Sequence, residues 1–157
     1  MLGEFGVGKT SLVRRFVHSI FSDRYMTTVG VKIDTREIEM EKGENVKLII
    51  WDIAGTDDIA ELEKRYIRGT AGYLLVADGT RPDTLDIALR IDKEVQELTG
   101  GSPRILLINK EDLESEWRIP AEQLMQLHKD GIEVYTTSAL TGNEVEDSFK
   151  RLASQLV

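Results

Sequence analysis

Apolar residues follow two different spacings along this chain, and the spacing separates strands from helices. Two stretches, GYLLVAD at 72–78 and RILLIN at 104–109, are continuous apolar runs, which is typical of strands buried on both faces. Residues 31–40 and 46–55 alternate more loosely on either side of the stretch EKGEN at 41–45, which contains Gly and Asn. This pattern predicts a hairpin whose first arm is half-buried at the edge of a sheet.

The remaining apolar residues mostly recur at helical spacing. They predict four helices, at residues 9–21, 84–100, 120–130 and 144–157, and one more strand at 132–138. Strands that alternate with helices predict an α/β fold. We expect one domain over residues 1–157, with three layers and a mostly parallel six-stranded sheet that has one antiparallel edge strand and helices on both faces. Ligands of such sheets bind beyond the carboxyl ends of the strands.

Composition narrows the classes of function. The chain has 157 residues, a formal charge of −8 and no cysteine. The negative charge argues against binding to nucleic acid or to anionic lipid. Disulfides, thiolate zinc sites and cysteine lipidation are excluded for these residues. No apolar run is long enough to span a bilayer, and the first residues lack a signal-peptide pattern. We therefore expect a cytoplasmic protein without a direct membrane anchor.

Residues 3–11, GEFGVGKTS, contain the spacing GxxxxGK[ST]. Its glycines let backbone N–H groups turn toward phosphates at the start of a helix, whose dipole favours an anion. Lys9 would reach the β- and γ-phosphates, and the Thr10 hydroxyl would bind Mg²⁺. The alternative is a glycine-rich turn with a chance lysine. It is weakened by the helix predicted directly after the motif.

Three further stretches follow predicted strands. In WDIAG, at 51–55, Asp52 lies at a strand end and would hold Mg²⁺ through water, although such an aspartate is often a cap or turn former. In NKED, at 109–112, Asp112 would accept two hydrogen bonds from a guanine edge, with the Lys110 stem along the base. A solvated loop is the alternative. In TSAL, at 137–140, the Ala139 amide would donate to the guanine carbonyl oxygen.

In this order, the four pieces resemble the Ras superfamily of small GTPases, and most of all its Rab-like branch. The stretch YMTTVGVKI at 25–33 is similar to the first switch of that branch, and WDIAGTDD at 51–58 is similar to the second. The resemblance runs from Gly3 to the end of the chain. It implies a P-loop NTPase fold, Mg²⁺ as cofactor, and GTP or GDP as the bound nucleotide.

The resemblance also assigns roles to single residues. The positions implied for catalysis are Lys9, Thr28, Gly55 and Thr56. Those implied for Mg²⁺ are Thr10, Thr28 and Asp52. Those implied for nucleotide binding are Gly3, Phe5, Gly6, Val7, Gly8, Lys9, Thr10, Ser11, Phe21, Tyr25, Thr28, Gly55, Asn109, Lys110, Asp112, Ser138, Ala139 and Leu140. Phe21 would meet the guanine edge-on, and a core residue at a helix end is the alternative. Tyr25 would cover the phosphates.

Three departures from the family pattern bear on activity. Thr56 stands where the family usually has the glutamine that orients the attacking water, and Phe5 stands where most members have a small residue. The Phe5 ring would point over the γ-phosphate or pack on the second switch. The C-terminal cysteines of the Rab branch are also absent. We therefore expect slow hydrolysis and no permanent lipid anchor.

The start of the sequence carries a structural expectation. Only Met1 and Leu2 precede the phosphate motif, so the first strand of the sheet is largely absent. Leaving a central position of a sheet empty would cost hydrogen bonds on both neighbouring strands. We expect about six apolar residues before Met1, a strand of ordinary length. Alternatively, another segment or a second copy fills the position.

The function implied is a molecular switch that binds GTP and GDP with Mg²⁺ and hydrolyses GTP slowly. GTP would order residues 22–33 and 55–68, which effector, exchange and activating proteins would then read. A GTP-binding scaffold without hydrolysis is the alternative from another class. A P-loop kinase or ATPase is a third, and NKED together with TSAL argues against it.

Overall fold

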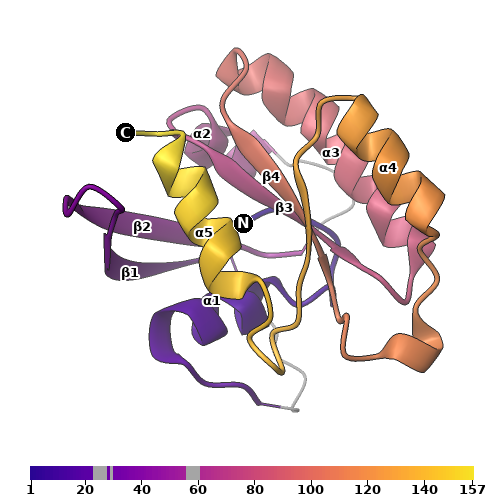
Figure 1. The fold of residues 1–157 in the computed structure, drawn as a ribbon. Helices are drawn as coiled ribbons and strands as arrows, with labels where there is room; N and C mark the ends of the chain where they lie inside the picture. Colours follow the sequence, from indigo (N-terminus) through magenta and orange to yellow (C-terminus); the bar gives the residue numbers. More distant parts are fainter. Residues whose placement is uncertain (23–27, 29, 56–60) are drawn as a thin grey trace.

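The computed structural model describes residues 1–22, 28, 30–55 and 61–157. Its elements, drawn in Figure 1, follow one another as α1 (Lys9–His18), β1 (Val31–Glu39), β2 (Asn45–Ile53), α2 (Glu61–Ile67), β3 (Tyr73–Asp78), α3 (Pro82–Thr99), β4 (Arg104–Asn109), the short 3₁₀ helix η1 (Glu114–Glu116), α4 (Ala121–Lys129), β5 (Val134–Thr136) and α5 (Val145–Ser154). None of the helices within the described ranges is long and apolar enough to cross a membrane.

The strands form a parallel sheet and an antiparallel hairpin, which confirms the α/β prediction. Strands β3, β4 and β5 are parallel in that order, whereas β1 and β2 pair along their whole length in antiparallel fashion. The six-strand count is not reached, because the described residues contain five strands. The sixth position is represented by a single parallel bridge between Leu2 and Leu75.

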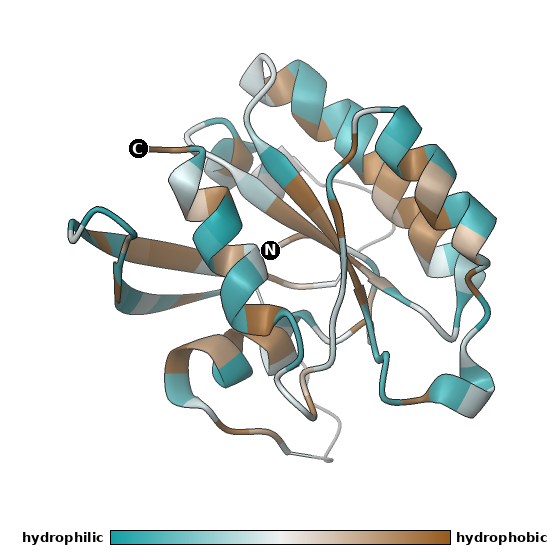
Figure 2. Ribbon diagram, in the orientation of Figure 1, coloured by the Kyte–Doolittle hydropathy of each residue, from teal (hydrophilic) through white to brown (hydrophobic). Residues whose placement is uncertain are grey.

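Two hydrophobic clusters, one on each face of the parallel sheet, hold the layers together. Successive side chains of a strand point to opposite faces of the sheet. Because every residue of β3 is buried, both faces of this strand are covered. Leu74 and Val76 pack with residues of α1 and α5, whereas Leu75 and Ala77 pack with residues of α3 and α4. Figure 1 shows these helix pairs on opposite sides of the sheet, and Figure 2 shows that the strands between them are hydrophobic.

Met1 and Leu2 lie between β2 and β3. The Leu2 N–H donates to the Leu74 carbonyl at 2.9 Å, and the Val76 N–H donates to Leu2 at 2.8 Å. On the other side, the amine of Met1 donates to the Trp51 carbonyl at 2.9 Å. Strands β2 and β3 are therefore not paired directly. Beside Met1 a cavity of about 510 Å³ separates them. The strand expected before Met1, or its alternatives, would fill this cavity, and this expectation stays a prediction.

Candidate nucleotide site

The glycine-rich loop, residues 3–8, runs from Leu2 to the start of α1 at the carboxyl ends of β3 and β4. Two of its glycines are required by close approach. A Cβ on Gly3 would lie 2.4 Å from the carbonyl oxygen of Val76, and one on Gly8 would lie 2.3 Å from Nδ2 of Asn109. Both glycines also have positive φ, 149° and 100°, which disfavours other residues. The loop therefore sits tightly against the ends of these two strands.

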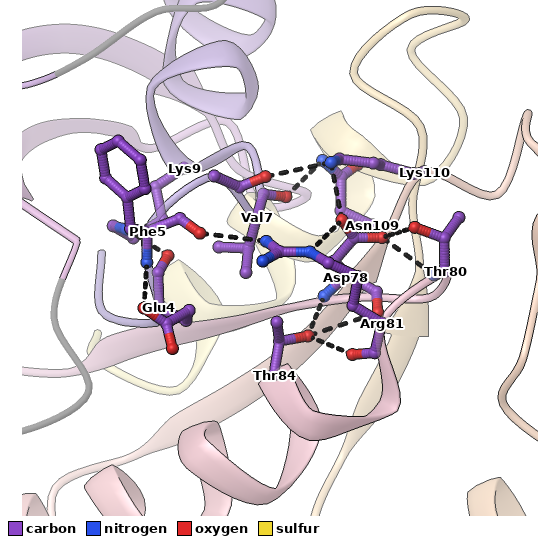
Figure 3. A network of polar contacts seen from close by, with 11 residues as sticks. Glu4, Phe5, Val7, Lys9, Asp78, Thr80, Arg81, Thr84, Asn109 and Lys110 are labelled. Atoms are coloured by element: carbon purple, nitrogen blue, oxygen red, sulfur yellow. Dashed lines mark hydrogen bonds and ion pairs between the residues drawn. The ribbon is translucent and has the colours of Figure 1, made fainter.

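Four side chains, from three parts of the chain, hold the carbonyl groups of this loop. Lys9 Nζ donates to the carbonyls of Gly3 and Glu4 at 3.1 and 3.0 Å. The Phe5 carbonyl accepts a hydrogen bond from Arg81 at 3.0 Å. The Gly6 carbonyl accepts from Lys110 at 3.0 Å, and the Val7 carbonyl accepts from Asn109 at 3.1 Å. Figure 3 shows the Arg81 and Lys110 contacts in one network.

This arrangement sets the direction of the loop amides. In a trans peptide the C=O and the following N–H point to opposite sides of the chain. Because the carbonyls of Phe5, Gly6 and Val7 face side-chain donors, the N–H groups that follow them face the other way. A small pocket with polar walls is lined there by Phe5, Gly6, Gly8, Lys9, Thr10, Ser11, Thr28 and Gly55. Inward-facing amides, a lysine and a helix start together suit an anion such as phosphate.

Thr10, Thr28 and Asp52 come together at one side of this pocket. Thr10 Oγ1 donates to Asp52 Oδ2 at 2.7 Å, and Thr28 Oγ1 lies 3.2 Å from the same oxygen. Asp52 is 1% exposed, and its Oδ1 has no hydrogen-bond partner among the described residues. A buried carboxylate oxygen without a partner is costly unless a cation or water meets it. Two hydroxyls and one carboxylate are oxygen ligands that suit Mg²⁺.

The stretch NKED, at 109–112, begins at the last residue of β4. Ser138 Oγ donates to Asp112 Oδ1 at 2.7 Å, which fixes the direction of that carboxylate. Lys110 has a positive φ of 73°, an uncommon conformation for a residue with a side chain. Its Nζ contacts both Gly6 and Asp78. Lys110 therefore connects the end of β4 with the glycine-rich loop, in addition to the base contact expected from sequence.

The Asn109 amide is directed to protein atoms in this structure, and its contact with the base stays a prediction. Nδ2 donates to Val7, and Oδ1 accepts from Thr137 at 3.2 Å and from the Ala139 amide at 3.3 Å. Asn109 is buried, so it ties the glycine-rich loop to the segment at 137–139. The Ala139 amide, expected to meet guanine, also donates to Asn109 in this structure.

The remaining expected residues divide into three groups. Phe21 is partly buried and packs against the cluster that contains Phe16, which favours the core alternative for its ring. Leu140 is exposed, and its carbonyl accepts from the Arg15 guanidinium. Tyr25 and Thr56 lie outside the described residues.

Phe5 lines the pocket with its side chain half exposed. Its solvent exposure is 48%, and Figure 3 shows the ring pointing away from the Arg81 network. Gly55 lies directly against the backbone of Phe5, because a Cβ on Gly55 would be 2.4 Å from the Phe5 Cα. The end of the stretch WDIAG, at 51–55, therefore contacts the backbone of Phe5.

Asp78 is a site residue that the sequence analysis missed. It is 1% exposed, and its carboxylate accepts from the Thr80 amide at 2.8 Å, from Lys110 at 2.6 Å and from Arg81 at 3.2 Å. Burial alone would raise the pKa of Asp78, but the hydrogen bonds from Lys110 and Thr80 outweigh it and hold the pKa below its ordinary value. The available signal was an aspartate that ends a wholly apolar strand.

An α/β fold with this loop at the carboxyl ends of its strands defines a P-loop nucleotide-binding protein. The Ras family profile matches residues 1–157. Ras-related protein Rab-13 of Canis lupus familiaris is 33% identical over 159 residues, which cover 100% of this chain and 78% of the relative. Ras-related protein Rab-15 of Homo sapiens is 34% identical over 97% of this chain and 72% of the relative. Ras-related protein RABA4b of Arabidopsis thaliana is 34% identical over 99% of this chain and 70% of the relative.

The chain therefore belongs to the Ras family. It is a small GTPase of the Rab-like type, a GTP-binding P-loop protein. The resemblance drawn from the four sequence motifs is confirmed.

Proposed function

We propose that this protein is a slow, Mg²⁺-dependent GTPase switch whose nucleotide state is reported by residues 22–33 and 55–68. One observation carries the proposal. Thr28, which belongs to the first of these segments, contacts both Thr10 of the glycine-rich loop and Asp52. A segment tied to the phosphate loop through one hydroxyl responds to whatever occupies that loop.

Each group in the site has a task in this proposal. The amides that follow Phe5, Gly6 and Val7, together with Lys9, bind the phosphate chain of GTP. Thr10, Thr28 and Asp52 are the residues that would hold Mg²⁺, which supplies charge neutralisation to the phosphates. Asp112, held by Ser138, accepts the two N–H groups of the guanine edge. Asn109 and Lys110 keep the base and phosphate parts of the site in register.

The test is a displacement assay with nucleotide-free protein and fluorescent GDP. GTP is expected to displace the label and ATP is not, since adenine would leave Asp112 unpaired. Equal displacement by ATP would favour a P-loop ATPase or kinase. Phosphate release over many turnovers then separates a GTPase from a GTP-binding scaffold, because the scaffold would bind GTP and release no phosphate.

Hydrolysis is expected to accelerate when Phe5 and Thr56 are replaced together. Phe5→Gly removes the ring beside the pocket, and Thr56→Gln supplies a side chain long enough to orient water. We expect single-turnover phosphate release about tenfold faster or more, because misplacing a reacting group by about 1 Å can cost about a hundredfold in rate. The two single variants are the controls. A double variant no faster than the original protein would contradict this reading, as would an original protein that hydrolyses GTP within seconds.

A further inference from the structure

Arg81 joins the end of β3 to the glycine-rich loop. It precedes α3, and its side chain is 42% exposed. Its Nε donates to Asp78 Oδ2 at 3.2 Å, and its terminal NH₂ donates to the Phe5 carbonyl at 3.0 Å (Figure 3). The planar guanidinium is thus shared between a buried carboxylate and a backbone oxygen of the loop.

We propose that Arg81 is a positioning residue of the nucleotide site, which holds the Phe5–Gly6 peptide so that the Gly6 N–H faces the phosphate chain. The inference rests on the proposed function, because it assigns a task toward the same bound nucleotide. It adds Arg81, which none of the sequence motifs includes, to the residues that determine how tightly that nucleotide is held.

Gly6 has a φ of 77°, and glycine adopts positive and negative φ with similar ease. The peptide before it can therefore rotate at small cost unless its oxygen is held. Lys110 fixes the next peptide through the Gly6 carbonyl, and Arg81 does the same for the Phe5 carbonyl. Without Arg81, the Gly6 N–H would spend part of its time turned away from the phosphate.

The anchor of Arg81 is itself rigid. Asp78 is buried and also accepts from Lys110 and Thr80, so its carboxylate keeps its place when Arg81 is replaced. The geometry requires arginine, since Nε and NH₂ of one planar group reach two acceptors at once. A lysine at this position would supply the charge but only one point of contact. We therefore expect the fold to survive replacement of Arg81 while the loop amide loses its fixed direction.

The experiment measures dissociation of fluorescent GDP in the presence of Mg²⁺ for three variants. Arg81→Ala is expected to speed dissociation about tenfold, the usual effect of losing one charge-assisted hydrogen bond. Arg81→Lys should restore the rate only in part. Lys93→Ala, which removes an exposed positive charge from α3, the helix that Arg81 precedes, is the control and should leave the rate unchanged.

Phosphorus-31 NMR of bound GDP supplies a readout that a merely structural role would not move. We expect the β-phosphate resonance to shift in Arg81→Ala and to stay in place in Lys93→Ala, with both variants unfolding within a few degrees of the original protein. An unchanged rate and resonance in Arg81→Ala would overturn the inference. Full rescue by lysine, or unfolding of both the alanine and lysine variants, would also overturn it. Failure of the original protein to bind GDP would instead contradict the proposed function.

Discussion

Asp112→Asn is expected to weaken GTP binding by about ten- to a hundredfold and to improve binding of xanthosine triphosphate. The Asp112 carboxylate is directed by Ser138 at 2.7 Å, and it matches the two N–H donors of the guanine edge. A hydrogen bond to a charged group is worth about 1.5–3 kcal/mol, and each 1.4 kcal/mol is about tenfold in affinity. Asparagine presents an N–H where the carboxylate presented an oxygen, which suits the carbonyl of xanthine.

The adjacent Glu111 offers a matched control for the Asp112 experiment. Glu111→Gln removes one negative charge next to Asp112, while Asn143 contacts the side chain of Glu111. Competition against fluorescent GDP should show that this variant keeps the original preference for GTP. If Asp112→Asn and Glu111→Gln alter GTP and xanthosine triphosphate binding alike, general charge is responsible and the assignment of Asp112 is wrong.

Loss of bound Mg²⁺ is expected to have the other large effect, on the rate of nucleotide release. Removing Mg²⁺ with EDTA should speed nucleotide release by about a hundredfold, the loss of two charge-assisted contacts of about 1.5 kcal/mol each. Thr10→Asn should do the same and should weaken GTP more than GDP. The reason is that a bulkier amide would stand where Thr10 now meets Asp52 and Thr28.

Thr10→Ser is the control for the metal prediction because serine keeps the hydroxyl. It should retain the dependence on Mg²⁺ and release nucleotide within a fewfold of the original rate. The comparison uses stopped-flow release of fluorescent GDP and of a fluorescent GTP analogue, each with and without EDTA. Equal release rates with and without EDTA would show that Mg²⁺ does not stabilise the bound nucleotide.

The sequence predicted the parts of this molecule that depend on short-range pattern. The continuous apolar runs became β3 and β4, and the helix after the phosphate motif became α1. Thr10 lines the pocket beside the glycine-rich loop, and its role toward Mg²⁺ stays a prediction. These features follow from hydrophobic periodicity and from short motifs, and both can be read from neighbouring residues of the sequence.

Features that depend on distant contacts are not contained in the sequence motifs. The motif places Asn109 beside the base, which stays a prediction, but it does not contain the hydrogen bonds of Asn109 to the glycine-rich loop and to 137–139. Asp78 and Arg81 belong to no motif, and their task appears only when β3 and the loop are side by side. Helix α2, at Glu61–Ile67, was not predicted either, because its seven residues lie inside a segment assigned to a switch.

The most direct test of the switch is amide hydrogen exchange of residues 22–33 and 55–68. The protein is measured with Mg²⁺ in its GDP form and with a GTP analogue that is not hydrolysed. The account predicts slower exchange in both segments with the GTP analogue, and loss of that protection at 22–33 in Thr28→Ala. Identical exchange in the two nucleotide states would contradict the claim that this protein is a GTP-dependent switch.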